Sequence, residues 1–263
     1  MSEISVIGDI HGHLDAYHRL LREDGLMDDA GDWCGGDRVL FQIGDLFDRG
    51  PDGIGCVDTT IRLQQQAREA GGRVECILGN HEIMFLAACL MGESLTSSGM
   101  RFFDQWQYWG GIAEDRDKFR DRHAEWLLSL PAMVMHEDTL LIHGDCQLYL
   151  SLGSTVEDVN AAFTDIVSSR ERGNWEAVLR GFGEHASFCH PPVPGAQRAM
   201  RFLDGYRANA IIHGHTPIPM AQHTPAESVT EAWRYVDRRC VNVDGGIYMG
   251  GPGFVTRWQG YDN

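Results

Sequence analysis

The order of apolar and polar positions predicts strand–helix units in the first third of the chain. Short apolar runs at residues 4–7, 39–43 and 74–78 each stop at a glycine, and a segment with apolar residues at helical spacing follows. The clearest helical patterns lie at 14–21 and 54–70. Three strand–helix repeats are typical of parallel βαβ units, so we expect an α/β fold.

The pattern changes at about residues 92–130, which are rich in polar and aromatic residues. We expect two helices here, forming an insertion beside the sheet, with most aromatic side chains in its core. The aromatic residues are Phe102, Phe103, Trp106, Tyr108, Trp109 and Trp126.

The rest of the chain predicts a mixture of strands and helices. Strands are expected at 132–136, 139–143 and 210–212, helices at 155–169, 175–181 and 197–208, a proline-rich loop at 188–195, and antiparallel strands within 234–258. No repeat or linker interrupts the sequence, so we expect a single domain over residues 1–263.

Composition limits the possible partners. The formal net charge of −16 argues against nucleic acid and anionic membranes, which are bound by Lys and Arg. No apolar window approaches the length of a transmembrane helix. Seven scattered cysteines without a CxxC pair, in a chain without an apolar leader, indicate free thiols, so we expect a cytoplasmic protein.

Metal-ligand residue types gather at five predicted strand ends. They lie in GDIHGH at 8–13, GDLFDRG at 44–50, GNHE at 79–82, HGD at 143–145 and HGHTP at 213–217. The carboxyl ends of parallel strands meet at one edge of a sheet, where α/β proteins place their ligands. Asp, His and Asn without neighbouring Cys describe a metal site rich in oxygen and nitrogen.

The spacing of these residues predicts a pair of metal ions. Asp9 and His11 are two residues apart and can face one ion, and the two carboxylate oxygens of Asp45 can bridge two ions. Asn80 adds a neutral oxygen, and His143 with one histidine of the HGH pair completes the second ion. Two divalent ions outweigh the two carboxylates, so the site attracts phosphate, and a water held between the ions can attack phosphorus.

Taken together and in this order, the five motifs resemble the calcineurin-like metallophosphoesterase superfamily. The DRG and GNHE versions look like its bacterial phosphoprotein phosphatase branch, and the motifs extend from Gly8 to about Gly246. The resemblance implies a central β-sandwich of mixed sheets, flanked by helices, with a dinuclear metal centre at one end.

The resemblance also implies roles for single residues. The implied ligands are Asp9, His11, Asp45, Asn80, His143 and His215, with His213 as the alternative to His215. The implied general acid is His81, oriented by Asp48, and the implied phosphate clamp is Arg49. The residue types agree, because a carboxylate can keep a histidine protonated and aimed, and arginine can grip two phosphate oxygens.

The sequence departs from the family pattern near the substrate. Three arginines, Arg170, Arg172 and Arg180, compete for a second phosphate contact, and we favour Arg172. The stretch 109–111 resembles an Asn-Gly-Gly segment of related phosphatases, but Trp109 replaces the Asn. The sequence therefore does not determine what the substrate rim receives, including whether it receives a protein. Asp244 resembles a family strand-end motif and is expected to support a turn or the surroundings of the metal ions.

We therefore expect a metal-dependent phosphatase that cleaves phosphate monoesters through a hydroxide bridging two divalent ions. Manganese is the expected metal, with Fe, Zn and Mg as alternatives. The expected substrate is phosphoserine or phosphothreonine on a protein. A small phosphorylated metabolite and a dinucleoside polyphosphate are the alternatives, and a non-catalytic phosphate-binding module is an alternative of another class.

Overall fold

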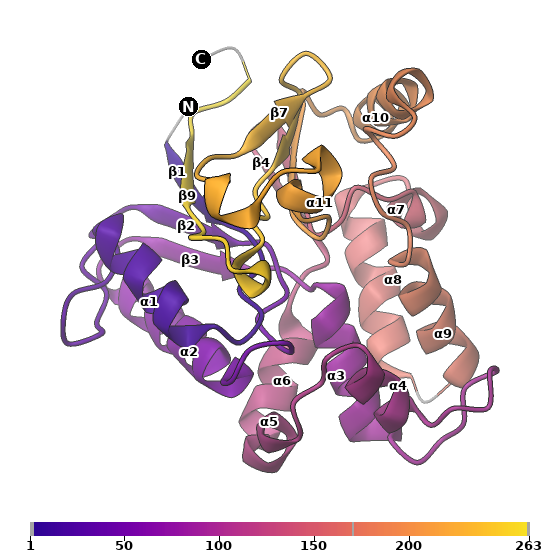
Figure 1. Cartoon of the computed structure of the whole chain (residues 1–263). Coiled ribbons are helices and arrows are strands. Elements are labelled where there is room, and N and C mark those ends of the chain that lie inside the picture. The colour runs from indigo at the N-terminus through magenta and orange to yellow at the C-terminus, as the bar shows by residue number, and fades with distance from the viewer. Residues whose placement is uncertain (1–2, 170, 262–263) are drawn as a thin grey trace.

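Two β-sheets face each other, and helices lie outside them (Figure 1). The computed structural model describes residues 3–169 and 171–261. The strand order of the first sheet is β3 (Arg73–Cys76), β2 (Val39–Gln42), β1 (Ile4–Ile7) and β9 (Val255–Trp258). The order of the second is β4 (Met133–His136), β5 (Thr139–Ile142), β6 (Ala210–His213), β8 (Cys240–Asn242) and β7 (Trp233–Tyr235).

Both sheets are mixed. Strands β1, β2 and β3 are parallel, as the strand–helix repeats predict, and β9 joins β1 antiparallel. In the second sheet β5, β6 and β8 are parallel, whereas β4 and β7 are antiparallel edge strands. The predicted α/β sandwich of mixed sheets is thus confirmed. In the last segment β7 and β8 pair antiparallel as expected, whereas the parallel pairing of β8 with β6 was not predicted.

Alternation along the strands builds two cores. In β1, Ile4 and Val6 face the second sheet and pack in a buried cluster with residues such as Ile212 and Val241. Ile7 belongs to the larger cluster beneath the helices. Successive side chains of a strand point to opposite faces, so a strand with helices on one side and a sheet on the other is apolar on both.

Eleven α-helices and two 3₁₀ turns surround the sheets in the part of the chain that the structure describes. The helices of the first half are α1 (Leu14–Glu23), α2 (Gly53–Glu69), α3 (Asn80–Met91), α4 (Phe102–Tyr108), α5 (Ala113–Lys118) and α6 (Asp121–Ser129). The later ones are α7 (Leu148–Leu152), α8 (Val156–Ser168), α9 (Arg172–Gly181), α10 (Pro192–Tyr206), α11 (Ile218–Gln222), η1 (Ala226–Ser228) and η2 (Ile247–Met249).

The aromatic insertion holds three helices, α4, α5 and α6, rather than the expected two. Gly110 has a left-handed backbone with φ of 103° and separates α4 from α5, which is too short to show a periodic pattern. Phe102 and Trp106 are buried as expected, and Phe103 and Trp126 are partly buried. Tyr108 and Trp109 are exceptions, at 75% and 53% exposure.

The predicted proline-rich loop at 188–195 is partly wrong, because α10 begins inside it. Pro191 is the N-cap and Pro192 the first helical residue of α10. Proline is compatible with the first helical turn, since the missing N–H has no partner within the helix there. Helices α7 and α11, of five residues each, were not predicted because one turn shows no periodicity.

No helix within residues 3–169 and 171–261 combines the length and the apolar character needed to span a bilayer.

Candidate metal centre

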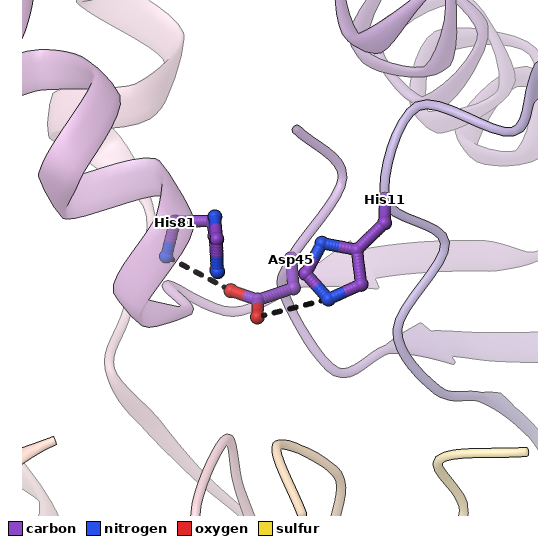
Figure 2. A group of neighbouring side chains, drawn as sticks. All are labelled: His11, Asp45 and His81. Carbon is purple, nitrogen blue, oxygen red and sulfur yellow. Dashed lines mark hydrogen bonds and ion pairs between the residues drawn. The ribbon is translucent and has the colours of Figure 1, made fainter. Parts of the chain in front are cut away.

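The candidate centre is built by the loops that leave β1 and β2 and by the start of α3 (Figure 2). The first two loops are joined through their backbones: the His11 N–H donates to the Asp45 carbonyl at 2.8 Å, and the Gly12 N–H to the Leu46 carbonyl at 2.7 Å. Adjacent parallel strands therefore bring their exit loops, and with them the side chains of His11 and Asp45, to one point.

Site residues share an uncommon backbone conformation. Positive φ angles occur at His11 (48°), Asp45 (55°), Asp48 (69°), Arg49 (66°) and His215 (67°). Non-glycine residues rarely adopt this left-handed region, which costs free energy that the surrounding hydrogen bonds must offset. The loops are therefore held in conformations that direct these side chains inward.

Glu82 joins the loops of the centre through hydrogen bonds to their backbones. Its carboxylate accepts the N–H groups of Asp45, Leu46 and Gly79 at 2.7–2.8 Å. Burial raises the pKa of Glu82 to about 7. Glu82 was assigned no role from the sequence. In the structure it is the third residue of α3, a position from which a carboxylate can cap backbone N–H groups.

The rings of His11 and His143 are aimed at opposite oxygens of Asp45. Nδ1 of His11 donates to the Phe47 carbonyl at 2.9 Å, and Nδ1 of His143 donates to the Ile43 carbonyl at 2.8 Å. The Nε2 atom of each ring therefore faces inward. His11 Nε2 lies 3.7 Å from Oδ2 of Asp45, and His143 Nε2 lies 3.4 Å from Oδ1. A histidine held at one nitrogen by a hydrogen bond, with the other nitrogen turned into the site, is the usual arrangement of a metal ligand.

Asn80 lies between two histidines. Its Oδ1 is 2.8 Å from His143 Nε2 and 2.9 Å from His215 Nδ1. His213, the alternative to His215, is turned elsewhere: its Nε2 lies 2.6 Å from the Tyr235 hydroxyl, and its Nδ1 donates to the Gly214 carbonyl. The geometry therefore favours His215 over His213. Asp45, His143 and His215 have ligand atoms close enough to share one ion.

Asp9 is buried beside a second carboxylate. It accepts the His215 N–H at 3.1 Å and lies 4.0 Å from His11 Nε2. Burial and the neighbouring Asp244 hold the pKa of Asp9 well above its usual range. Asp244 accepts the Gly246 N–H through Oδ1, as a turn-supporting residue does, while its buried Oδ2 has no hydrogen-bond partner among the described residues.

Charge in the centre follows from these contacts. Burial alone would raise the pKa of Asp45, but His143 and His81 hold it well below its usual range. For His143 the effects are reversed. Burial lowers its pKa, but the effect of the Asp45 carboxylate is larger and raises the pKa of His143 to about 10. Carboxylates packed with inward-facing imidazoles and an amide oxygen match the ligands of divalent transition ions, so the residues present fit the implied metal pair.

His81 occupies the start of α3 and is held by Asp48. Its Nδ1 lies 2.6 Å from Asp48 Oδ2, and its backbone N–H donates to Asp45 at 3.0 Å. The indole N–H of Trp106, which sequence reasoning placed only in the core, donates to the other Asp48 oxygen at 2.7 Å. The ring also lies near enough to His11 and Asp45 to share an ion with them, but its Nδ1 is engaged by Asp48.

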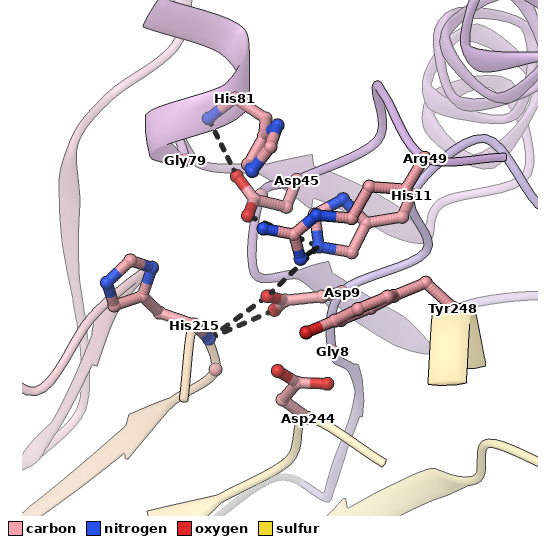
Figure 3. Close-up of polar contacts among 12 residues, drawn as sticks. Gly8, Asp9, His11, Asp45, Arg49, Gly79, His81, His215, Asp244 and Tyr248 are labelled. Atoms are coloured by element: carbon pink, nitrogen blue, oxygen red, sulfur yellow. Dashed lines mark hydrogen bonds and ion pairs between the residues drawn. The ribbon is translucent and has the colours of Figure 1, made fainter. Parts of the chain in front are cut away.

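Arg49 reaches over the centre from the loop after β2 (Figure 3). Its guanidinium lies 2.8 Å from His11 Nε2 and 4.2 Å above the ring of Tyr248. Its backbone N–H donates to the Gly110 carbonyl at 2.8 Å, which ties the insertion to the site. Tyr248 is a site residue that the sequence did not reveal, because it lies in a short 3₁₀ turn without a motif of its own.

The favoured second arginine does not lie at the site. Arg172 is exposed, lies 4.0 Å from Glu176 and donates to the Leu95 carbonyl. Arg180, one of its two competitors, lines the cavity that opens beside the centre. Arg170, the other, lies outside the described residues. The position of Arg172 therefore does not support its expected role, whereas that of Arg180 does.

A β-sandwich whose strand ends carry clustered histidines, aspartates and an asparagine has the architecture of a metallophosphoesterase. The chain belongs to the calcineurin-like phosphoesterase family, whose model matches residues 3–219. This confirms the family that the five motifs predict.

Two relatives carry the name Shewanella-like protein phosphatase. One, from Arabidopsis thaliana, is 33% identical over 134 residues, which are 48% of this chain and 34% of the relative. The other, from Plasmodium berghei, is 30% identical over 159 residues, which are 60% and 42%. The matches thus span about two fifths or less of these relatives. A cold-active protein-tyrosine phosphatase of a psychrophilic Shewanella species shares the fold, with a TM-score of 0.71 at 20% identity, covering 99% of this chain and 76% of that one.

Proposed function

We propose that the chain hydrolyses phosphate monoesters with two divalent metal ions. The observation that carries the proposal is the arrangement around Asp45, whose two carboxylate oxygens face the inward nitrogens of His11 and His143. The proposed ligands are Asp9, His11 and Asp45 for one ion, and Asp45, Asn80, His143 and His215 for the other. When bound, the ions would supply Lewis acidity toward phosphate oxygens and a water activated at neutral pH. Manganese is our proposed metal, since no cysteine lies among the ligands.

The protein supplies the proton for the leaving group. As the bond between phosphorus and the substrate oxygen breaks, that oxygen needs a proton, and His81 Nε2 is the proposed donor. Asp48 holds the ring from its Nδ1 side at 2.6 Å, so Nε2 is the nitrogen left for the substrate. Arg49 and Arg180 both line the cavity, and their guanidinium groups are suited to grip the phosphate oxygens in a fork.

We propose a phosphorylated side chain of a protein, with phosphoserine or phosphothreonine foremost, as the substrate. The names of the two relatives support a protein substrate. A small phosphorylated metabolite is the second candidate, because a cavity of about 330 Å³ beside the centre is large enough to enclose a small organic group.

Turnover of 4-nitrophenyl phosphate tests the proposal directly. We expect hydrolysis with manganese, its loss on chelation and its recovery when manganese is restored. Phosphopeptides, metabolite phosphates and diadenosine tetraphosphate at matched concentrations then rank the substrate classes. Binding of inorganic phosphate without turnover of any ester, whichever divalent ion is added, would instead identify a binding module and refute the proposed hydrolysis.

A further inference from the structure

The cavity beside the centre lies between three helices. Its volume is about 330 Å³, and residues of α3, α4 and α9 line it together with the segment 96–98. Asn80, His81 and Arg49 form the end that adjoins the proposed metal ions. A substrate whose phosphate binds there must place its organic group in the rest of the cavity.

The direction of α9 orders the lining residues. The helix ends at Gly181, and beyond it the ring of His185 stacks on that of His215 at 4.1 Å, so its carboxyl end meets the centre. Glu176 and Arg180, four residues apart, both line the cavity. Residues at this spacing share one face of a helix, so Glu176 lies about one turn before Arg180 along α9, away from the carboxyl end that meets the centre.

The stretch next to the centre is largely apolar. Met84 follows His81 by three residues on α3, and Leu179 and Phe182 face it from α9 and its end. Trp109, 53% exposed, forms part of the wall where α4 ends. An exposed indole at the rim of a cavity offers a flat surface for an aromatic or other apolar group.

The far end carries a negative charge. The Glu176 side chain is only 13% exposed and lines the cavity, and its carboxylate accepts the Ser97 N–H. Arg172 lies 4.0 Å from the same oxygen, but it is 55% exposed and outside the lining. Among the described lining residues, the cations are Arg49 and Arg180, both nearer the centre.

We propose that Glu176 decides which phosphate monoesters the cavity accepts. It selects an ester whose organic group is apolar beside the phosphate and carries a positive charge or N–H donors one helical turn beyond. It disfavours a second anionic group at that distance, because a carboxylate shielded from water repels negative charge more strongly than an exposed one. This inference rests on the proposed phosphatase function and adds its substrate class.

Three aryl phosphates test the inference. They are phenyl phosphates whose para substituent is aminomethyl, hydroxymethyl or carboxymethyl, and kcat/KM is measured for each with manganese-loaded protein. We expect the order cationic, neutral, anionic in the wild type. In Glu176→Gln the ratio of cationic to anionic substrate should fall about tenfold, because both an attraction and a repulsion are removed.

Two controls keep the test decisive. Glu171→Gln removes the same charge from the exposed N-cap of α9, outside the cavity, and should leave the ratio unchanged. The Tm of Glu176→Gln should match that of the wild type, which shows that the variant is folded. An unchanged ratio in Glu176→Gln, or a wild type that prefers the anionic ester, would overturn the inference while leaving the proposed function intact. Absence of all turnover would overturn both.

Discussion

Single side chains at the centre are each fixed by a second contact away from it. His11 and His143 donate to backbone carbonyls, and His81 is held by Asp48, so each ring presents its Nε2 to the site. Such contacts set the orientation of an imidazole before ligand binding, which reduces the conformational entropy lost when the ligand binds. The chemistry of the site thus depends on residues that touch neither metal nor substrate.

Trp106 is the clearest example of such a residue. In Trp106→Phe, Asp48 loses the N–H donor at 2.7 Å and holds His81 less firmly. We expect kcat to fall about tenfold with metal content unchanged, as is typical for residues that orient a site residue. Trp126→Phe, which removes an indole N–H bonded to Gln64, is the matched control and should keep full activity. Equal losses in both variants would assign the effect to stability.

The two described candidates for the second arginine give opposite expectations. Arg180→Ala should raise the KM for aryl phosphate about tenfold, because a charged hydrogen bond to phosphate contributes about 1.5–3 kcal/mol. Arg172→Ala should leave KM unchanged, since Arg172 does not line the cavity. Steady-state kinetics of the two variants decides between them, and the reverse pattern would restore the sequence-based preference for Arg172.

Residues in motifs were predictable, and residues outside them were not. Asp9, His11 and Asn80 stand in strand-end motifs, and the carboxyl ends of neighbouring strands bring such residues together. Tyr248 and Trp106 meet the site only through tertiary contacts, and their sequence neighbours resemble those of ordinary core or turn residues. Their roles depend on which distant segments fold together, and spacing in one sequence does not encode that.

Some helices and strands were also predictable from the sequence, and others were not. Strands β1, β2 and β3 were predictable because each is an apolar run ended by glycine, and their parallel order follows from the helices between them. The division of the insertion into α4, α5 and α6 was not, because helices as short as six residues show no period and depend on packing for stability. The parallel pairing of β8 with β6 joins segments that no short turn connects, so sequence spacing did not reveal it.

One contact between elements predicts a pH effect. Asp115 of α5 accepts the Gly53 and Ile54 N–H groups at the start of α2, and burial raises the pKa of Asp115 to about 6 from 3.8. The folded state thus binds the carboxyl proton of Asp115 more tightly than the unfolded state does. The stability that this protonation contributes is complete below pH 3.8 and is lost as the pH rises through about 6.

Thermal unfolding from pH 4 to 7 measures this contribution. In Asp115→Asn the side chain no longer titrates, so the Tm of the variant relative to the wild type should rise over that interval. Asp117→Asn, a change at an exposed residue of the same helix, provides the control. A difference in Tm that stays constant with pH would contradict the assignment.

The whole protein is acidic, and its proposed substrate is an anion. The formal net charge is −16, and three of the carboxylates, those of Asp9, Asp45 and Asp244, are buried at the site itself. Binding of divalent ions to the folded state alone would therefore stabilise the fold by mass action. At an ion concentration of 100 times Kd, the gain is about 2.7 kcal/mol for one ion.

Chelation tests this stabilisation. We expect removal of metal to lower the Tm by about 5 °C or more, and added manganese to restore it. Asp45→Asn, which lacks the bridging carboxylate, should show a much smaller response to both treatments. A Tm that is independent of metal in the wild type would argue against ion binding at these buried carboxylates.

The metal content and turnover of His81→Asn test most directly whether His81 is a proton donor and not a metal ligand. If His81 donates the proton and binds no ion, the variant should retain two manganese ions per chain, measured by mass spectrometry of the metal. Its turnover of aryl phosphate should fall at least about 100-fold, as expected for loss of a general acid. Loss of an ion together with activity would contradict the role of His81 as proton donor. His81 would then be a metal ligand, together with His11 and Asp45, which lie close to it.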